Sequence, residues 1–196
     1  MRKFISKKSI LIVTLALLLT VAVGSTLAYI FMRTDPVNNT FTPAQVSCAV
    51  VEEFKDNVKS NVKIQNTGDT DAYIRVAIVI TWKSADGTKV WAQKPVEGID
   101  YTITMPSNTG WISASDGYYY YSSAVSSNAV TGILIKEVTP KDGRQPPAYY
   151  LSVEIVASAI QASPDDVVRD QWSNEKITLI GNDGALTVEE KKEETT

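Results

Sequence analysis

Two aspartates spaced two residues apart are the side chains best suited to hold a metal ion. Asp69 and Asp71 lie in the string NTGDTDAYIRV at 66–76. Calcium prefers carboxylate oxygens, so a calcium site is one interpretation of this spacing. The fuller oxygen array of a DxDxDG loop is missing from the string. Asn, Gly and Asp also form turns by bonding nearby backbone groups. We therefore expect a turn without a metal, and calcium binding is the alternative.

A second candidate site is the aromatic run in GWISASDGYYYYSS at 110–123. Neighbouring residues of a strand point to opposite faces, so Tyr118 and Tyr120 share one face and Tyr119 and Tyr121 share the other. Trp111 lies just across a predicted turn. If exposed, this strip would bind sugar rings or another subunit. We expect the packed arrangement instead, with one tyrosine pair in the core and the other covering the sheet.

The composition argues against the commonest enzymes. The chain has no histidine, which excludes Ser-His-Asp and Cys-His catalysis and every His-ligated zinc site. The single cysteine, Cys48, excludes an internal disulfide and a multi-Cys metal site. It shares a predicted strand face with Val46 and Val50, so we expect a small buried hydrophobic residue. No catalytic residue, metal ligand or cofactor is predicted. The net charge of -3 also argues against a nucleic-acid partner.

The N-terminus has the order of a secretory signal peptide. Basic residues in MRKFISKK precede an uncharged apolar stretch at 10–23, which is followed by the small-residue run GSTLA at 24–28. This order is typical of an exported protein. Signal peptidase requires small side chains at the -3 and -1 positions, which are Thr26 and Ala28. We therefore predict cleavage before Tyr29, with a signal peptidase as the partner during export.

The alternative for this segment is an uncleaved membrane anchor. Residues 10–32 carry no charge, which is long enough to span a bilayer. Both interpretations place the rest of the chain outside the cytoplasm. The predicted location is therefore secreted, at the cell surface or in the extracellular matrix, and otherwise membrane-anchored with the domain outside.

The remainder of the chain has the pattern of short β-strands. In 72–82, the face of Ile74, Ile78 and Trp82 is wholly apolar and is predicted to face the core. In 58–65, Val58, Ser60 and the following apolar residues are predicted to point inward in strict alternation. Further strands are predicted at 46–54, 101–105, 110–114, 117–123, 131–138 and 149–162.

Three Asp-Gly pairs lie between apolar runs, at 86–87, 116–117 and 142–143. Such pairs favour tight hairpins, because hairpin turns require positive φ. Only the segment 164–172 is predicted to be helical, since it starts with proline followed by two aspartates. The segment 187–196 is charged, and we expect a flexible tail. These features predict an all-β, antiparallel sandwich with one short helix, preceded by the signal or transmembrane helix.

Three stretches together resemble a known family. They are the small-residue run with the aromatic residue after it (GSTLAY), NTFTPAQV at 39–46, and NTGDTDAYIRV at 66–76. They are similar to exported Gram-positive proteins with a SipW-type signal peptide, the TasA and camelysin (CalY) family. The resemblance covers about the first 80 residues and implies a jelly-roll-like sandwich. It also implies a SipW-type signal peptidase as the export partner.

In fibre-forming members of that family, the mature N-terminal segment completes a sheet of the next subunit. The resemblance places this role on an extended arm, 29–45, preceding a sandwich domain at 46–186. Pro36 interrupts continuous pairing of the arm. Some members carry a metalloendopeptidase label, but a chain with no His and one Cys offers poor zinc ligands. The arm residues expected to take part are Tyr29, Ile30, Phe31, Val37 and Phe41.

The sequence predicts a non-enzymatic exported structural protein, and the resemblance implies that it self-associates through β-strand addition, as in a biofilm fibre. The first alternative is a surface binding or adhesion module, in which the strip of Trp111 and the tyrosines docks a glycan or a matrix protein. A metalloendopeptidase is the remaining alternative.

Overall fold

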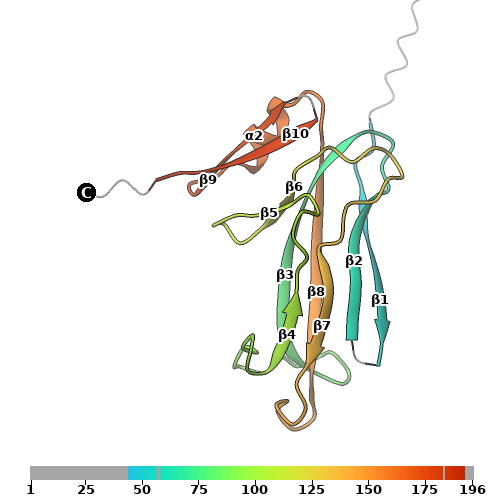
Figure 1. Ribbon diagram of the computed structural model, residues 1–196, viewed down its shortest axis with the longest axis vertical. Helices are drawn as coiled ribbons and strands as arrows, with labels where there is room; N and C mark the ends of the chain where they lie inside the picture. Colours follow the sequence, from blue (N-terminus) through green and yellow to red (C-terminus); the bar gives the residue numbers. More distant parts are fainter. Residues whose placement is uncertain (1–43, 57, 183, 193–196) are drawn as a thin grey trace, which may run out of the picture. The chain divides into compact units, whose positions relative to one another are not determined.

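The computed structural model describes residues 44–192 except 57 and 183, and all of these belong to the unit Pro43–Thr196. This part of the chain consists of antiparallel strands and one short helix, which confirms the predicted all-β class (Figure 1). Within it, no helix combines the length and apolar character needed to cross a bilayer. The predicted signal segment and the arm residues 29–43 lie outside the described residues.

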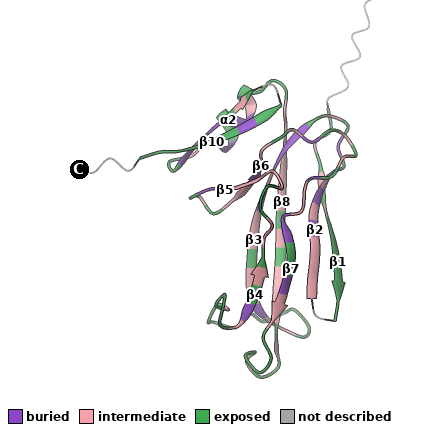
Figure 2. Cartoon of the chain, viewed as in Figure 1, coloured by how far each residue is buried: buried purple, intermediate pink, exposed green. Residues whose placement is uncertain are grey.

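The first sheet has the strand order β1-β2-β7-β4, so β1 and β4 lie at its opposite edges. Every neighbouring pair in it is antiparallel. Exposed residues follow most of β1, as expected for an edge strand (Figure 2). Its strands are β1 (Cys48–Lys55), β2 (Val58–Asn66), β7 (Ile135–Pro140) and β4 (Tyr101–Thr104).

The second sheet has the order β5-β6-β3-β8, and a two-stranded ribbon pairs β9 with β10. Most connections along the chain cross between the two large sheets, as in a jelly-roll-like sandwich. The remaining elements are β3 (Ala72–Ser84), β5 (Trp111–Ser113), β6 (Tyr119–Tyr121), β8 (Tyr149–Gln161), α2 (Asp166–Trp172), β9 (Ile177–Asn182) and β10 (Ala185–Glu190).

The main core lies between the two large sheets. Val62 and Ile64 from β2 pack with Ile74 and Val76 from β3, and all four are fully buried. Burial of such side chains stabilises the fold by about 1.5–3 kcal/mol each. The predicted apolar face of β3 is therefore confirmed as the core face.

A second core, which the sequence analysis does not predict, lies on the other face of β3. Tyr73 is fully buried there, against Val168 of α2 and Leu179 of β9. The helix and the β9-β10 ribbon cover this end of the outer face, which hides a residue that strict alternation would leave exposed. The predicted helix at 164–172 is confirmed, although it begins two residues later, at Asp166, and ends at Trp172 as predicted.

Three details of the sequence prediction are wrong. The alternation in β2 breaks at Asn61, whose φ is 53°. Ser60 pairs with the exposed Glu137, and paired residues share a face of the sheet, so Ser60 does not point inward as predicted. The Asp-Gly pair at 142–143 does not close a hairpin, because β7 and β8 belong to different sheets. The predicted tail begins too early, since 187–190 form part of β10.

Candidate functional site

The strand β3 has a complete partner on one side only. All of its residues, from Ala72 to Ser84, pair with β8. On the opposite side, β6 pairs with Arg75 and Val76 alone. From Ala77 onward, no described strand pairs with this side of β3 until an isolated bridge joins Lys83 and Val90. The stretch 77–81 therefore has an open edge.

The hydrogen bonds at the two ends of this stretch show which backbone groups point to the open edge. Ala72 exchanges both of its backbone bonds with Val125, at 3.0 and 2.9 Å. At the other end, the carbonyl oxygen of Trp82 accepts from the Trp91 amide at 2.9 Å. Backbone direction alternates along an antiparallel strand, so Ile78 and Ile80 point to this same side. Their N–H and C=O groups have no partner strand among the described residues.

A groove of about 660 Å³ runs beside this edge. Ile78 and Ile80 form one wall, and Tyr101, Ile103 and Met105 in and after β4 form the opposite wall. All five pack in or against the main core. The groove thus joins an unpaired backbone edge to an opening over the hydrophobic core. This combination is what an added β-strand requires.

The upper end of the groove is set by the turn between β5 and β6. A longer β6 would extend beside β3 past Val76. Instead, the chain turns back to β5 at Asp116-Gly117, directly before β6. Gly117 lines the groove. Gly117 has a φ of 88°, which residues other than glycine rarely adopt. The turn therefore ends sheet pairing after Val76 and leaves the rest of the edge open.

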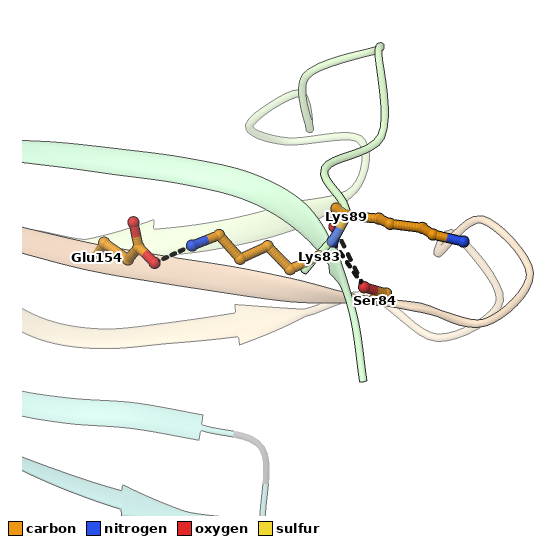
Figure 3. A network of polar contacts seen from close by, with 4 residues as sticks. All are labelled: Lys83, Ser84, Lys89 and Glu154. Atoms are coloured by element: carbon orange, nitrogen blue, oxygen red, sulfur yellow. Dashed lines mark hydrogen bonds and ion pairs between the residues drawn. The ribbon is translucent and has the colours of Figure 1, made fainter. Parts of the chain in front are cut away.

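The lower end is closed by a small hairpin after β3. Ser84 and Lys89 exchange two hydrogen bonds of 3.0 Å, Ser84 N to Lys89 O and Lys89 N to Ser84 Oγ. Next to it, the ammonium group of Lys83 bonds the carboxylate of Glu154 on β8 (Figure 3). These contacts hold the C-terminal end of β3 in place. The open edge at 77–81 therefore belongs to a fixed strand.

One polar side chain at the groove lacks a partner. The Thr81 hydroxyl is buried without a hydrogen-bond partner in the described part of the protein, and Thr81 lines the groove. An unsatisfied buried hydroxyl costs roughly 1–3 kcal/mol.

The aromatic strip does not form an exposed surface. Tyr120 is fully buried in the second core and Tyr118 packs against that core. Tyr119, Tyr121 and Trp111 pack against the main core instead. The expectation of two tyrosines per face is therefore confirmed, but both faces are covered by packed residues.

Hydrogen bonds hold the main-core side of the strip. The Trp111 indole donates to the carbonyl oxygen of Gly132 at 2.9 Å, and the Gly132 amide donates to the Tyr121 hydroxyl at 3.1 Å. The rings of Trp111 and Tyr121 meet edge to face, with centroids 5.2 Å apart. These rings make structural contacts and are partly buried.

The other side of the strip contains a charged network. The guanidinium of Arg75 lies between the rings of Tyr118 and Trp172, at 4.3 and 4.5 Å from their centroids. The Tyr120 hydroxyl donates to the Asp116 carboxylate at 2.7 Å. Burial, and secondly this hydrogen bond, raise the pKa of Tyr120 well above its ordinary value. The network fixes α2 and the start of β6 to β3.

The two predicted aspartates are placed differently. The Asp69 carboxylate accepts the Gln45 amide at 2.6 Å, whereas Asp71 is exposed and bonds Ala162 through its backbone oxygen. No group of three or more acidic or cysteine residues converges among the described residues. The predicted turn is present, but Asp69 bonds a segment far away in the sequence.

Cys48 packs against the core as predicted, but it is less buried than the sequence analysis expects. It is half-buried and packs against the main core beside Val50. Burial raises the pKa of its thiol, which disfavours the nucleophilic thiolate. The predicted cleavage residues Thr26, Ala28 and Tyr29 and the remaining predicted arm residues lie outside the described part.

Sequence reasoning missed the groove. The apolar run of β3 predicts a strand but carries no signal of which neighbours pair with it. The nearest signal is the Asp116-Gly117 turn, which shows that β6 is short. Comparisons with family models, with curated proteins and with solved structures find no match to this chain.

Proposed function

We propose that this protein is an exported structural subunit of a cell surface or matrix, and that it assembles by adding a β-strand of one copy to the open edge of another. The observation that carries this proposal is the groove beside Ile78 and Ile80. The order of basic, apolar and small residues at the N-terminus supports export.

The incoming strand is the arm of a second copy, which begins at Tyr29 after cleavage. Tyr29, Ile30 and Phe31 give it apolar side chains on both faces. Each side chain that packs onto the core contributes about 1.5–3 kcal/mol, and each backbone bond to Ile78 or Ile80 about 1 kcal/mol net. Binding must exceed the cost of ordering the arm, so the apolar residues supply most of the affinity.

The strand order of the first sheet favours a neighbour's groove over the groove of the same copy. The described chain enters at β1, while the groove borders β4, and these two strands are the opposite edges of the first sheet. A contact between an arm at one edge and a groove at the other is head to tail. Such a contact does not close on itself, so it produces filaments.

Light scattering on two chains tests this function. The chain 29–196 should form large, polydisperse particles, and the chain 43–196 should remain monomeric. A matched control carries Ile30→Asp and Phe31→Asp in the longer chain, which keeps the arm but removes its apolar face, and it should also stay monomeric. Monomers of the unmodified chain 29–196 over a wide concentration range would overturn the proposal.

A further inference from the structure

The turn between β2 and β3 is held together by the buried side chain of Asn66. Its amide nitrogen donates to the carbonyl oxygens of Thr70 and Val125, at 2.8 and 2.7 Å. Its amide oxygen accepts the Gly68 amide at 2.9 Å. Asn66 is fully buried, so these bonds satisfy a side chain that water cannot reach. The turn is therefore a fixed structure on which other residues can dock.

The outer side of this turn binds the segment that leads into β1. The Gln45 amide donates to the Asp69 carboxylate at 2.6 Å, and the Asp69 amide donates back to the Gln45 carbonyl at 3.0 Å. The Ser47 carbonyl accepts the amides of Thr67 and Gly68, at 3.0 and 3.2 Å. The hydroxyls of Ser47 and Thr67 are 2.8 Å apart. Five contacts thus hold two residues that lie about 20 positions earlier in the sequence.

Gly68 is required by this contact. A Cβ atom at position 68 would lie 2.3 Å from the Gln45 carbonyl oxygen and 3.0 Å from the Ser47 amide nitrogen. Both atoms belong to the backbone, so neither can move away without displacing the segment. The glycine therefore permits close approach of a second chain segment.

We infer that the turn 67–69 is a clamp for the base of the arm, and that Asp69 is a positioning residue for assembly. The inference rests on the proposed function and deepens it. The clamp fixes Gln45 and Ser47, so the residues directly before β1 are held in one defined place. A shorter free segment has fewer conformations to lose when it inserts, so ordering it costs less free energy.

Substitutions at Asp69 and Gln45 in the chain 29–196 test the clamp. Asp69→Ala removes the carboxylate. Gln45→Pro removes the backbone N–H that donates to this carboxylate, and it leaves the sequence of the turn unchanged. Each should raise the protein concentration needed for assembly by about fivefold or more, because the freed residues must be ordered again on insertion. Asp69→Asn keeps an acceptor oxygen and should assemble like the unmodified chain. Asp71→Ala is the matched control, because Asp71 is exposed and bonds the Ala162 amide through its backbone oxygen.

A synthetic peptide of residues 29–43 separates this inference from the proposed function. Bound to the chain 43–196, it should have the same affinity whether or not that chain carries Asp69→Ala, because it reaches the groove without using the clamp. If the peptide binds but Asp69→Ala and Gln45→Pro assemble like the unmodified chain, the clamp is overturned. An equal loss in Asp71→Ala would also overturn it. If the peptide does not bind and the unmodified chain does not assemble, the proposed function fails and the clamp fails with it.

Discussion

The upper and lower parts of β3 have the same sequence pattern but different surroundings. Between Ala72 and Val76, β3 is flanked by β8 on one side and by Val125 and β6 on the other. Over 77–81 it has β8 alone. The buried fraction follows this difference, since Val76 is fully buried while Ile78 and Ile80 are half-buried. Strand pairing, not hydrophobicity, determines which part is closed.

The open edge of β3 at 77–81 is built into the fold. The Asp116-Gly117 turn removes β6 from the lower part, and the hairpin of Ser84 and Lys89 fixes its far end. An exposed, long edge would favour uncontrolled pairing with other chains. Limiting the open edge to a short stretch with a groove beside it restricts the partners that fit.

The largest expected effect is a difference in stability between proline substitutions on the two edges of β3 over 77–81, the edge paired with β8 and the open edge. Val79 lies opposite Glu154 and its amide points to β8, whereas the Ile80 amide points to the groove. Val79→Pro removes a ladder bond, and the free energy of unfolding should fall by about 2–4 kcal/mol. Ile80→Pro should cost about 1–2 kcal/mol from lost side-chain packing. Urea unfolding of the chain 43–196 measures both.

The same two substitutions also separate assembly from folding. In the chain 29–196, Ile80→Pro should abolish assembly at a concentration where the domain is still folded, because it removes the amide that the arm needs. The account of the open edge is wrong if Ile80→Pro destabilises the domain as much as Val79→Pro does.

A smaller effect is expected in the upper part. Tyr120→Phe removes the hydroxyl that bonds Asp116 and leaves the ring in the second core. The carboxylate keeps a bond of 3.0 Å from Asn174, so the free energy of unfolding should fall by only about 1–2 kcal/mol. Assembly should be unchanged when measured well below the unfolding midpoint, since this residue lies away from the open edge. A loss of assembly with an intact fold would contradict the separation of the two parts.

The pH dependence of stability gives the smallest effect. The pKa of Tyr120 is raised above its ordinary value near 10, first by burial and then by the bond to Asp116. Above pH 10 the tyrosine ionises in the unfolded chain but stays protonated in the folded protein. The folded state therefore keeps its full stability below the unfolded-state pKa and loses stability as the pH rises above about 10. Urea unfolding between pH 9 and 11 should show a fall in stability that is shallower in Tyr120→Phe. Identical slopes would show that Tyr120 does not contribute.

Much of the fold follows from local sequence. Alternation predicts β3 and most other strands, and Pro164 with the aspartates after it predicts the helix. Two outcomes depend on contacts between distant segments, which local patterns do not contain. Tyr73 is buried because the helix and the β9-β10 ribbon cover it, and Asp69 bonds Gln45 instead of its own turn. The groove is also non-local, because it depends on the strand that is absent beside Ile80.

Amide hydrogen exchange at Ile78 and Ile80 tests the central claim most directly. In the chain 43–196 both amides should exchange rapidly, while Val79 and Thr81, whose amides point to β8, are protected. Addition of the peptide 29–43 should protect Ile78 and Ile80 and leave Val79 unchanged. Protection of Ile78 and Ile80 before the peptide is added, or no change after it binds, would contradict the claim that this edge accepts the arm.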